Sequence, residues 1–181
     1  MSYDLDLYFR SPEFPDKEWA EILSWFDAIE RTVEPEKFGH TPYLGKEWFI
    51  QVGGYGIFCT VYERHPRYQF QDKKAHWEIA ISTGNGLGLR QFFGYTLCYC
   101  ALSLLPETSA WDRGKYFDTL YQKPDKFLSK VNAVINSNFL YRERKERLAM
   151  QKLGVMDENF HLIPNPHVLK FAAQSNLYNN G

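Results

Sequence analysis

Apolar and polar side chains alternate at the start of the chain, in the stretch SYDLDLYF at residues 2–9. A period of two is typical of a β-strand with one buried face. We therefore expect a core-facing row of Tyr3, Leu5, Leu7 and Phe9 and an opposite, polar row of Asp4, Asp6 and Tyr8. The paired carboxylates Asp4 and Asp6 could hold a cation or a partner's basic group, but a solvated strand face is the ordinary interpretation.

Apolar residues at helical spacing predict three helical regions. Residues 16–32 form an amphipathic pattern that continues to Val33, with Asp16 as a plausible N-cap. Residues 89–105 predict a mostly buried helix that ends at Pro106. Residues 126–138 predict a third helix, capped by Asp125, with a strongly charged helical continuation over 139–153 that Gly154 stops.

The remaining apolar segments read as strands. Residues 47–63 predict a hairpin around a Gly53–Gly56 turn, residues 75–83 a central strand, and residues 113–122 a short strand. This order mixes hairpins with crossovers, so we expect an α+β fold: a two-layer sandwich of a mostly antiparallel sheet with helices packed on one face. We assign residues 1–153 to a single α+β domain and residues 154–181 to a partly irregular C-terminal extension, interrupted by Pro164 and Pro166.

Composition narrows the class of protein. The chain has 181 residues, of which 44% are hydrophobic and 17% aromatic, which suits one folded domain and excludes a disordered chain. No apolar run approaches the ~20 residues of a membrane span, and the N-terminus has no signal-peptide pattern, so we expect a cytoplasmic protein. The three cysteines, Cys59, Cys98 and Cys100, lack CxxC spacing and are expected to be buried free thiols.

The charge is small overall but unevenly distributed. A net charge of −1 predicts neither a nucleic acid nor a membrane partner. Residues 1–36, however, hold ten acidic residues against three basic ones. If the first helix shows an acidic face to water, that face could bind a basic protein partner, although a solvated helix face is the ordinary alternative. In the basic helix at 139–153, Glu143 and Glu146 interrupt the positive field, which favours a self-paired surface over phosphate binding.

A glycine-rich loop joins the strand at 75–83 to the buried helix. Such a junction can present backbone N–H groups to an anion, and the alternative ligand site that it suggests comprises Ser82, Thr83, Gly84, Asn85, Gly86, Gly88 and Arg90. The spacing matches neither GxGxxG nor GxxxxGK[ST]. The favoured interpretation is therefore geometric, with glycines that permit positive φ and a close approach of helix to sheet.

No catalytic, metal or cofactor site is predicted. The histidines (His40, His65, His76, His161 and His167) show no metal-binding spacing. His76 and Glu78 share one strand face and could form an acid–base pair, but a solvent-facing row is favoured. There is no GxSxG motif, and no histidine stands near Cys98 or Cys100.

Three stretches, SYDLDLYF, HWEIAISTGNG and GKYFDTLYQKPDKFL, together resemble small uncharacterised bacterial proteins that begin with a SYDL-type strand. The resemblance covers up to two thirds of the chain and implies a cytoplasmic immunity or antitoxin-like protein; it brings no catalytic residues. Our first hypothesis is thus a non-enzymatic protein that binds a basic partner through an acidic and aromatic surface. The alternatives are an anion-binding protein or enzyme that uses residues 82–90, and a module that self-associates as a homodimer.

Overall fold

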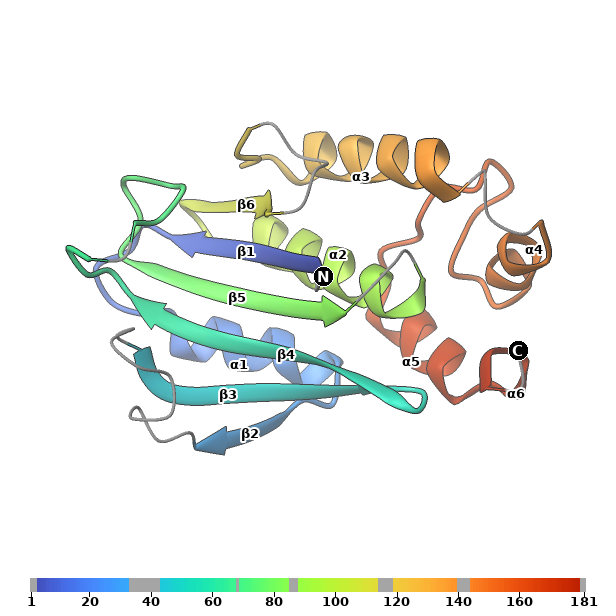
Figure 1. Cartoon of the computed structure of the whole chain (residues 1–181), viewed down its shortest axis with the longest axis horizontal. Helices are drawn as coiled ribbons and strands as arrows, with labels where there is room; N and C mark the ends of the chain where they lie inside the picture. The colour runs from blue at the N-terminus through green and yellow to red at the C-terminus, as the bar shows by residue number, and fades with distance from the viewer. Residues whose placement is uncertain are drawn as a thin grey trace.

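A single antiparallel sheet organises the computed structural model, which describes residues 3–32, 43–67, 69–84, 88–113, 119–139 and 144–179. Its strand order is β2-β3-β4-β5-β1-β6 (Figure 1). The strands are β1 (Tyr3–Phe9), β2 (Ile29–Thr32), β3 (Tyr43–Val52), β4 (Tyr55–Glu63), β5 (Trp77–Gly84) and β6 (Thr108–Asp112). The helices pack on one face, so the predicted α+β class is confirmed.

Helix α2 is the centre of the helical layer. The helices are α1 (Asp16–Trp25), α2 (Leu89–Leu104), α3 (Pro124–Phe139), α4 (Arg144–Lys152), α5 (Pro166–Gln174) and the short α6 (Asn176–Asn179). Helix α2 packs against β1, β4, β5 and β6, while α1, α3 and α5 pack against α2. In Figure 1, α1 and α2 lie behind the sheet, so the near face of the strands carries no helix.

Glycine has two separate uses where β5 meets α2. Gly84 has φ +77°, a left-handed conformation that glycine adopts without strain and that turns the chain out of β5. Gly94, inside α2, lies close against the sheet: a Cβ there would lie 2.8 Å from Thr83 Cγ2 and 2.9 Å from Leu5 Cδ1. The positive φ is therefore found in the glycine-rich loop, as expected, but the close approach is made within the helix.

The first predicted helix is wrong at its C-terminal end. Helix α1 ends at Trp25, and Asp27 takes a left-handed φ of 52° before the chain enters β2. Ile29 fits the helical spacing but is 58% exposed, because it lies opposite Phe49 on the edge of the sheet. Strand pairing with β3 therefore outweighs the helical pattern in this segment.

Two C-terminal expectations also need correction. The short strand expected at 113–122 lies earlier, as β6, and Tyr121 forms an isolated bridge to Ala110; residues 114–118 lie outside the described residues. Residues 166–174 form α5 rather than an irregular stretch, because the Asn165 side chain accepts a hydrogen bond from the His167 N–H and Pro166 opens the helix. The boundary after residue 153 stays a prediction, although Leu169 and Ala172 belong to the main core.

The apolar core lies between the sheet and the helices. Leu5, Leu7 and Phe9 face it, as the alternation predicts, and so do Ile79 and Ile81 of β5. The expected free thiols of Cys59, Cys98 and Cys100 are buried and unpaired. The expectation that Asp6 and Tyr8 face solvent is wrong, because they are 0% and 2% exposed. Both faces of β1 are therefore buried, and the second face carries polar groups.

Candidate functional site

A guanidinium joins two buried carboxylates on the sheet face that lies away from the helices. Arg113, after β6, binds Asp6 of β1 in a bidentate manner, with Nη2–Oδ1 at 2.8 Å and Nε–Oδ2 at 3.1 Å. The same Nη2 lies 3.5 Å from Glu78 Oε1 of β5. Both acids are almost fully buried. Asp6 is therefore part of an internal ion-pair network rather than a solvated row or a cation site.

Tyr8 shares this face and is covered by the β4–β5 connection. Its ring packs on Phe70 with centroids 5.6 Å apart, and Ala75 completes this second apolar cluster. The Gln71 N–H donates to the Tyr8 hydroxyl at 3.3 Å. Burial, followed by the charges of Asp6 and Glu78, raises the pKa of Tyr8 far above its usual value. The phenol therefore keeps its proton at any physiological pH.

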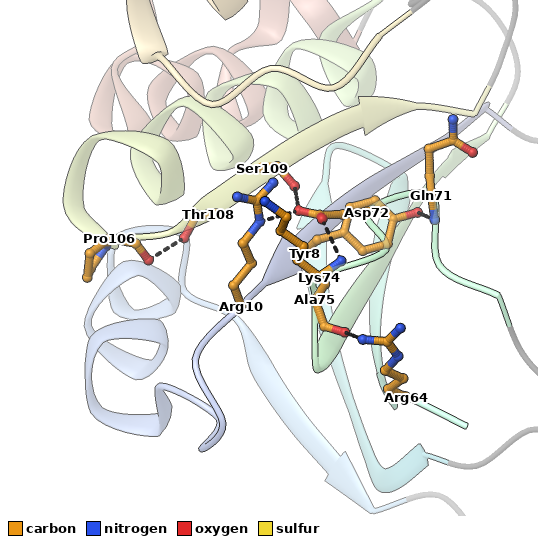
Figure 2. Close-up of polar contacts among 10 residues, drawn as sticks. All are labelled: Tyr8, Arg10, Arg64, Gln71, Asp72, Lys74, Ala75, Pro106, Thr108 and Ser109. Atoms are coloured by element: carbon orange, nitrogen blue, oxygen red, sulfur yellow. Dashed lines mark hydrogen bonds and ion pairs between the residues drawn. The ribbon is translucent and has the colours of Figure 1, made fainter. Parts of the chain in front are cut away.

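A third buried acid, Asp72, ties this connection to the sheet (Figure 2). Its Oδ2 accepts from Arg10 Nε at 2.9 Å and from Ser109 Oγ at 2.7 Å, and its Oδ1 accepts from the Lys74 N–H at 3.1 Å. Burial alone would raise the pKa of Asp72, but the hydrogen bonds from Arg10, Ser109 and Lys74 outweigh it and lower the pKa. Asp72 is therefore held in its ionised form, and Arg10 compensates its negative charge.

His76 and Glu78, which could have formed an acid–base pair, lie in two different environments. Glu78 is buried beside Arg113, so the expectation of a solvent-facing row is wrong for this residue. His76 is exposed and lines a hollow at the end of the sheet. Within the described part of the chain, no group of three or more His, Cys, Asp or Glu side chains is arranged to hold a metal ion.

The alternative site at 82–90 is described in part, because Asn85 and Gly86 lie outside the described residues. Thr83 is buried and its hydroxyl donates to Gln91 Oε1. The Arg90 guanidinium lies against Gly84, where a Cβ would be 2.7 Å from Nη1. Ser82 is half-buried on β5, and Gly88 precedes α2 with extended backbone. The structure thus brings Gly84 and Arg90 together, while the anion-binding role stays a prediction.

The acidic face expected on the first helix does face water. Asp16, Glu18 and Glu21 of α1 and Glu13 just before it are all exposed, and none forms an ion pair with another described residue. Beside them, a groove of about 410 Å³ runs between the start of α1 and the end of α2. Its apolar lining is Phe9, Phe14, Leu105 and Pro106.

The cysteines have the properties of core residues. Burial raises the pKa of Cys59 and of Cys98 well above the usual thiol value, and it raises the pKa of Cys100 to about 11. A thiol with so high a pKa carries almost no thiolate at neutral pH and is a poor nucleophile.

Comparisons of the chain with protein-family models, curated proteins and solved structures find no match. Among the described helices, none is both long and apolar enough to cross a membrane.

Proposed function

We propose that the chain is a non-enzymatic, immunity-like cytoplasmic protein that binds a basic protein partner through the acidic face of α1. The observation that supports this most directly is the exposure of Glu13, Asp16, Glu18 and Glu21, none of which forms an ion pair with another described residue. Asp6, Glu78 and Asp72, by contrast, are each paired with an arginine. An uncompensated acidic surface attracts basic partners and raises their association rate.

The groove beside α1 adds an apolar contact to this charge. Phe9 and Leu105 at its base are buried, while Glu13, Asp16 and Glu18 stand on its rim with Lys17. An apolar centre with a polar, charged rim is the usual anatomy of a protein interface. The partner that fits is a segment with an apolar side chain flanked by lysine or arginine.

The buried titratable groups support binding rather than catalysis. The Tyr8 phenol and the three thiols have raised pKa values, so they are neutral at physiological pH. The buried acids Asp6, Glu78 and Asp72 take part in ion pairs that hold strands and loops together. We therefore infer that these buried groups stabilise the fold rather than take part in a reaction.

The edge strand β2 weighs against self-association by edge pairing. Ile29 and Arg31 share one face of the sheet, and Glu30 and Thr32 share the other. A symmetric antiparallel pair centred on the middle of β2 places either Glu30 opposite Glu30 or Arg31 opposite Arg31. Like charges directly opposite one another destabilise a strand pair. A homodimer that pairs the middle of β2 with itself is therefore disfavoured.

The test is calorimetric titration with purified basic toxin domains as candidate partners. We compare the natural chain with the triple variant Glu13→Gln, Asp16→Asn, Glu18→Gln. The matched control neutralises three other exposed acids, Glu107→Gln, Asp125→Asn and Glu158→Gln. We expect a complex at micromolar concentration that the first triple variant weakens by at least about tenfold and the control changes less than about twofold.

Two results would contradict the proposal. One is the absence of any complex with basic partners at micromolar concentration. The other is a complex whose affinity is unchanged in the Glu13, Asp16, Glu18 variant, because the acidic face would then lie outside the interface. Thermal unfolding of each variant shows that lost binding does not reflect lost folding.

A further inference from the structure

A second hollow lies at the end of the sheet, between the β4–β5 connection and the segment that follows β1. Its volume is about 640 Å³, which falls within the range of small-molecule sites. Arg64, Lys73, His65 and His76 line it together with Glu63 and the buried Asp72. Cationic and imidazole groups thus outnumber the acids around this space.

The two cations of the hollow have only weak contacts within the described residues. Arg64 Nη1 donates to the Ala75 carbonyl at 3.4 Å, and Lys73 Nζ donates to Gln69 Oε1 at 3.5 Å (Figure 2 shows the Arg64 contact). Neither forms an ion pair with a described acid. Both charges therefore remain available to a ligand that carries negative charge.

Of the two acids that line the hollow, Glu63 is exposed and Asp72 is already compensated by a cation. Asp72 pairs with Arg10 at 2.9 Å, and Arg10 approaches it from the end of β1. The hydrogen bonds from Ser109 and from the Lys74 N–H occupy the carboxylate further. A further hydrogen bond closes the turn that carries Lys73: the Ala75 N–H donates to the Asp72 backbone carbonyl at 3.1 Å. Asp72 therefore positions the turn that carries Lys73.

The imidazole side chains of His65 and His76 add hydrogen-bond donors to the lining of the hollow. The Arg67 N–H donates to His65 Nδ1 at 3.1 Å, which leaves the proton of the neutral ring on Nε2. His65 can therefore donate a hydrogen bond from Nε2 without becoming charged. His76 is exposed at the same hollow.

Aromatic side chains supply an apolar part of the lining. Phe70 and Trp77 line the hollow and are 3% and 9% exposed. The Trp77 indole N–H is already used, since it donates to the Pro12 carbonyl at 3.2 Å. Although both rings are largely buried, Phe70 and Trp77 therefore give the hollow a small apolar surface.

From these contacts we infer that the hollow binds a small organic anion, in which a carboxylate or phosphate group meets Arg64 and Lys73 and an apolar body lies against Phe70 and Trp77. Arg64 provides the planar fork that suits either anion, and Lys73 adds a point charge. This site is separate from the acidic face of α1 and does not depend on the protein-binding proposal.

Nuclear magnetic resonance titration tests the site with defined probes. The probes are phenyl phosphate, benzoate, inorganic phosphate and neutral benzyl alcohol, and the readout is the amide shifts of residues 63–77 with the Trp77 indole N–H. We expect saturable shifts with phenyl phosphate or benzoate below about 5 mM, and binding of inorganic phosphate and of benzyl alcohol at least about tenfold weaker. The two organic anions distinguish a phosphate site from a carboxylate site.

Matched variants separate this site from general surface charge. The test variant is Arg64→Gln, Lys73→Gln, and the control is Arg67→Gln, Lys74→Gln, which removes the same charge from the same segment outside the lining. We expect the test variant to lose at least about tenfold in affinity and the control to change less than about twofold. Equal losses in both variants, equal binding of inorganic and phenyl phosphate, or no saturable shift with either organic anion would each overturn the proposal.

Discussion

The two faces of the sheet are both buried near its centre, but by different interactions. On β5, Ile79 and Ile81 face α2 in an apolar core, while Glu78 on the opposite face is buried against Arg113. The first face is stabilised by the removal of apolar surface from water. The second depends on arginines that compensate buried acids. Alternation along a strand therefore predicts which face of the sheet a residue occupies, but not whether that face is exposed to solvent.

The largest effect should come from the apolar face. Ile79 is fully buried, so Ile79→Ala removes buried methyl groups and leaves a cavity. We expect the free energy of unfolding to fall by about 3–4 kcal/mol. Urea unfolding measures this value, with Ala80→Ser on the opposite face as the control. A loss below about 1 kcal/mol would show that the core can close around the cavity.

The polar face should respond next most strongly, through Arg113→Met. This change leaves Asp6 and Glu78 buried without their shared guanidinium. Removing one partner of a buried ion pair is strongly destabilising, but the Arg113 side chain is 42% exposed, so we expect a smaller loss of about 2–3 kcal/mol in urea unfolding.

A combined variant sharpens this prediction. Adding Asp6→Asn and Glu78→Gln to Arg113→Met removes the uncompensated charges and should restore more than half of the lost stability. If the triple variant is less stable than Arg113→Met alone, the loss comes from Arg113 packing rather than from the acids, and the two faces differ less than we infer.

The smallest of the three effects should be the loss of the Asp72 contacts, and it should depend on pH. Because the native pKa of Asp72 is lowered, its contribution to stability is complete above its unfolded pKa and is lost as the pH falls through the native value. We expect Asp72→Asn to cost about 1–2 kcal/mol at pH 7 and progressively less below about pH 4.

Urea unfolding at a series of pH values measures the Asp72 effect. Arg10→Gln is the control, since it removes the main cation beside Asp72. It should likewise reduce the dependence of the free energy of unfolding on pH in the acidic range. A difference between the natural chain and Asp72→Asn that stays constant from pH 7 to below pH 3 would contradict the assigned role of Arg10 and Ser109.

The sequence patterns predict the local parts of the fold. Alternation locates β1, apolar and β-branched content locates β5, and the Gly53–Gly56 turn locates the β3–β4 hairpin, while the acids of α1 do face water. The patterns fail where local signals compete. Ile29 continues a helical spacing but pairs as a strand, and Pro166 looks like an interruption although it opens α5 behind an Asn165 cap.

The polar network could not be predicted from local patterns. Arg113 and Asp6 are 107 positions apart, and Arg10 and Asp72 are 62 apart, so no motif connects them. The cationic hollow likewise depends on how the β4–β5 connection folds back beside the segment after β1. A buried acid on an alternating strand does require a partner, so an acid in a strand next to aromatic residues is a reason to search for an arginine elsewhere.

The position of β1 in the sheet has a consequence for biosynthesis. This strand comes first in chain order, yet it lies between β5 and β6, with Leu7 opposite both Ile79 and Ala110 (Figure 1). A ribosome therefore releases β1 long before either neighbour exists, and the sheet closes only once Asp112 has emerged. Until β5 has emerged, Leu5, Leu7 and Phe9 are apolar residues of an unpaired strand, which makes the nascent chain a natural client for chaperones.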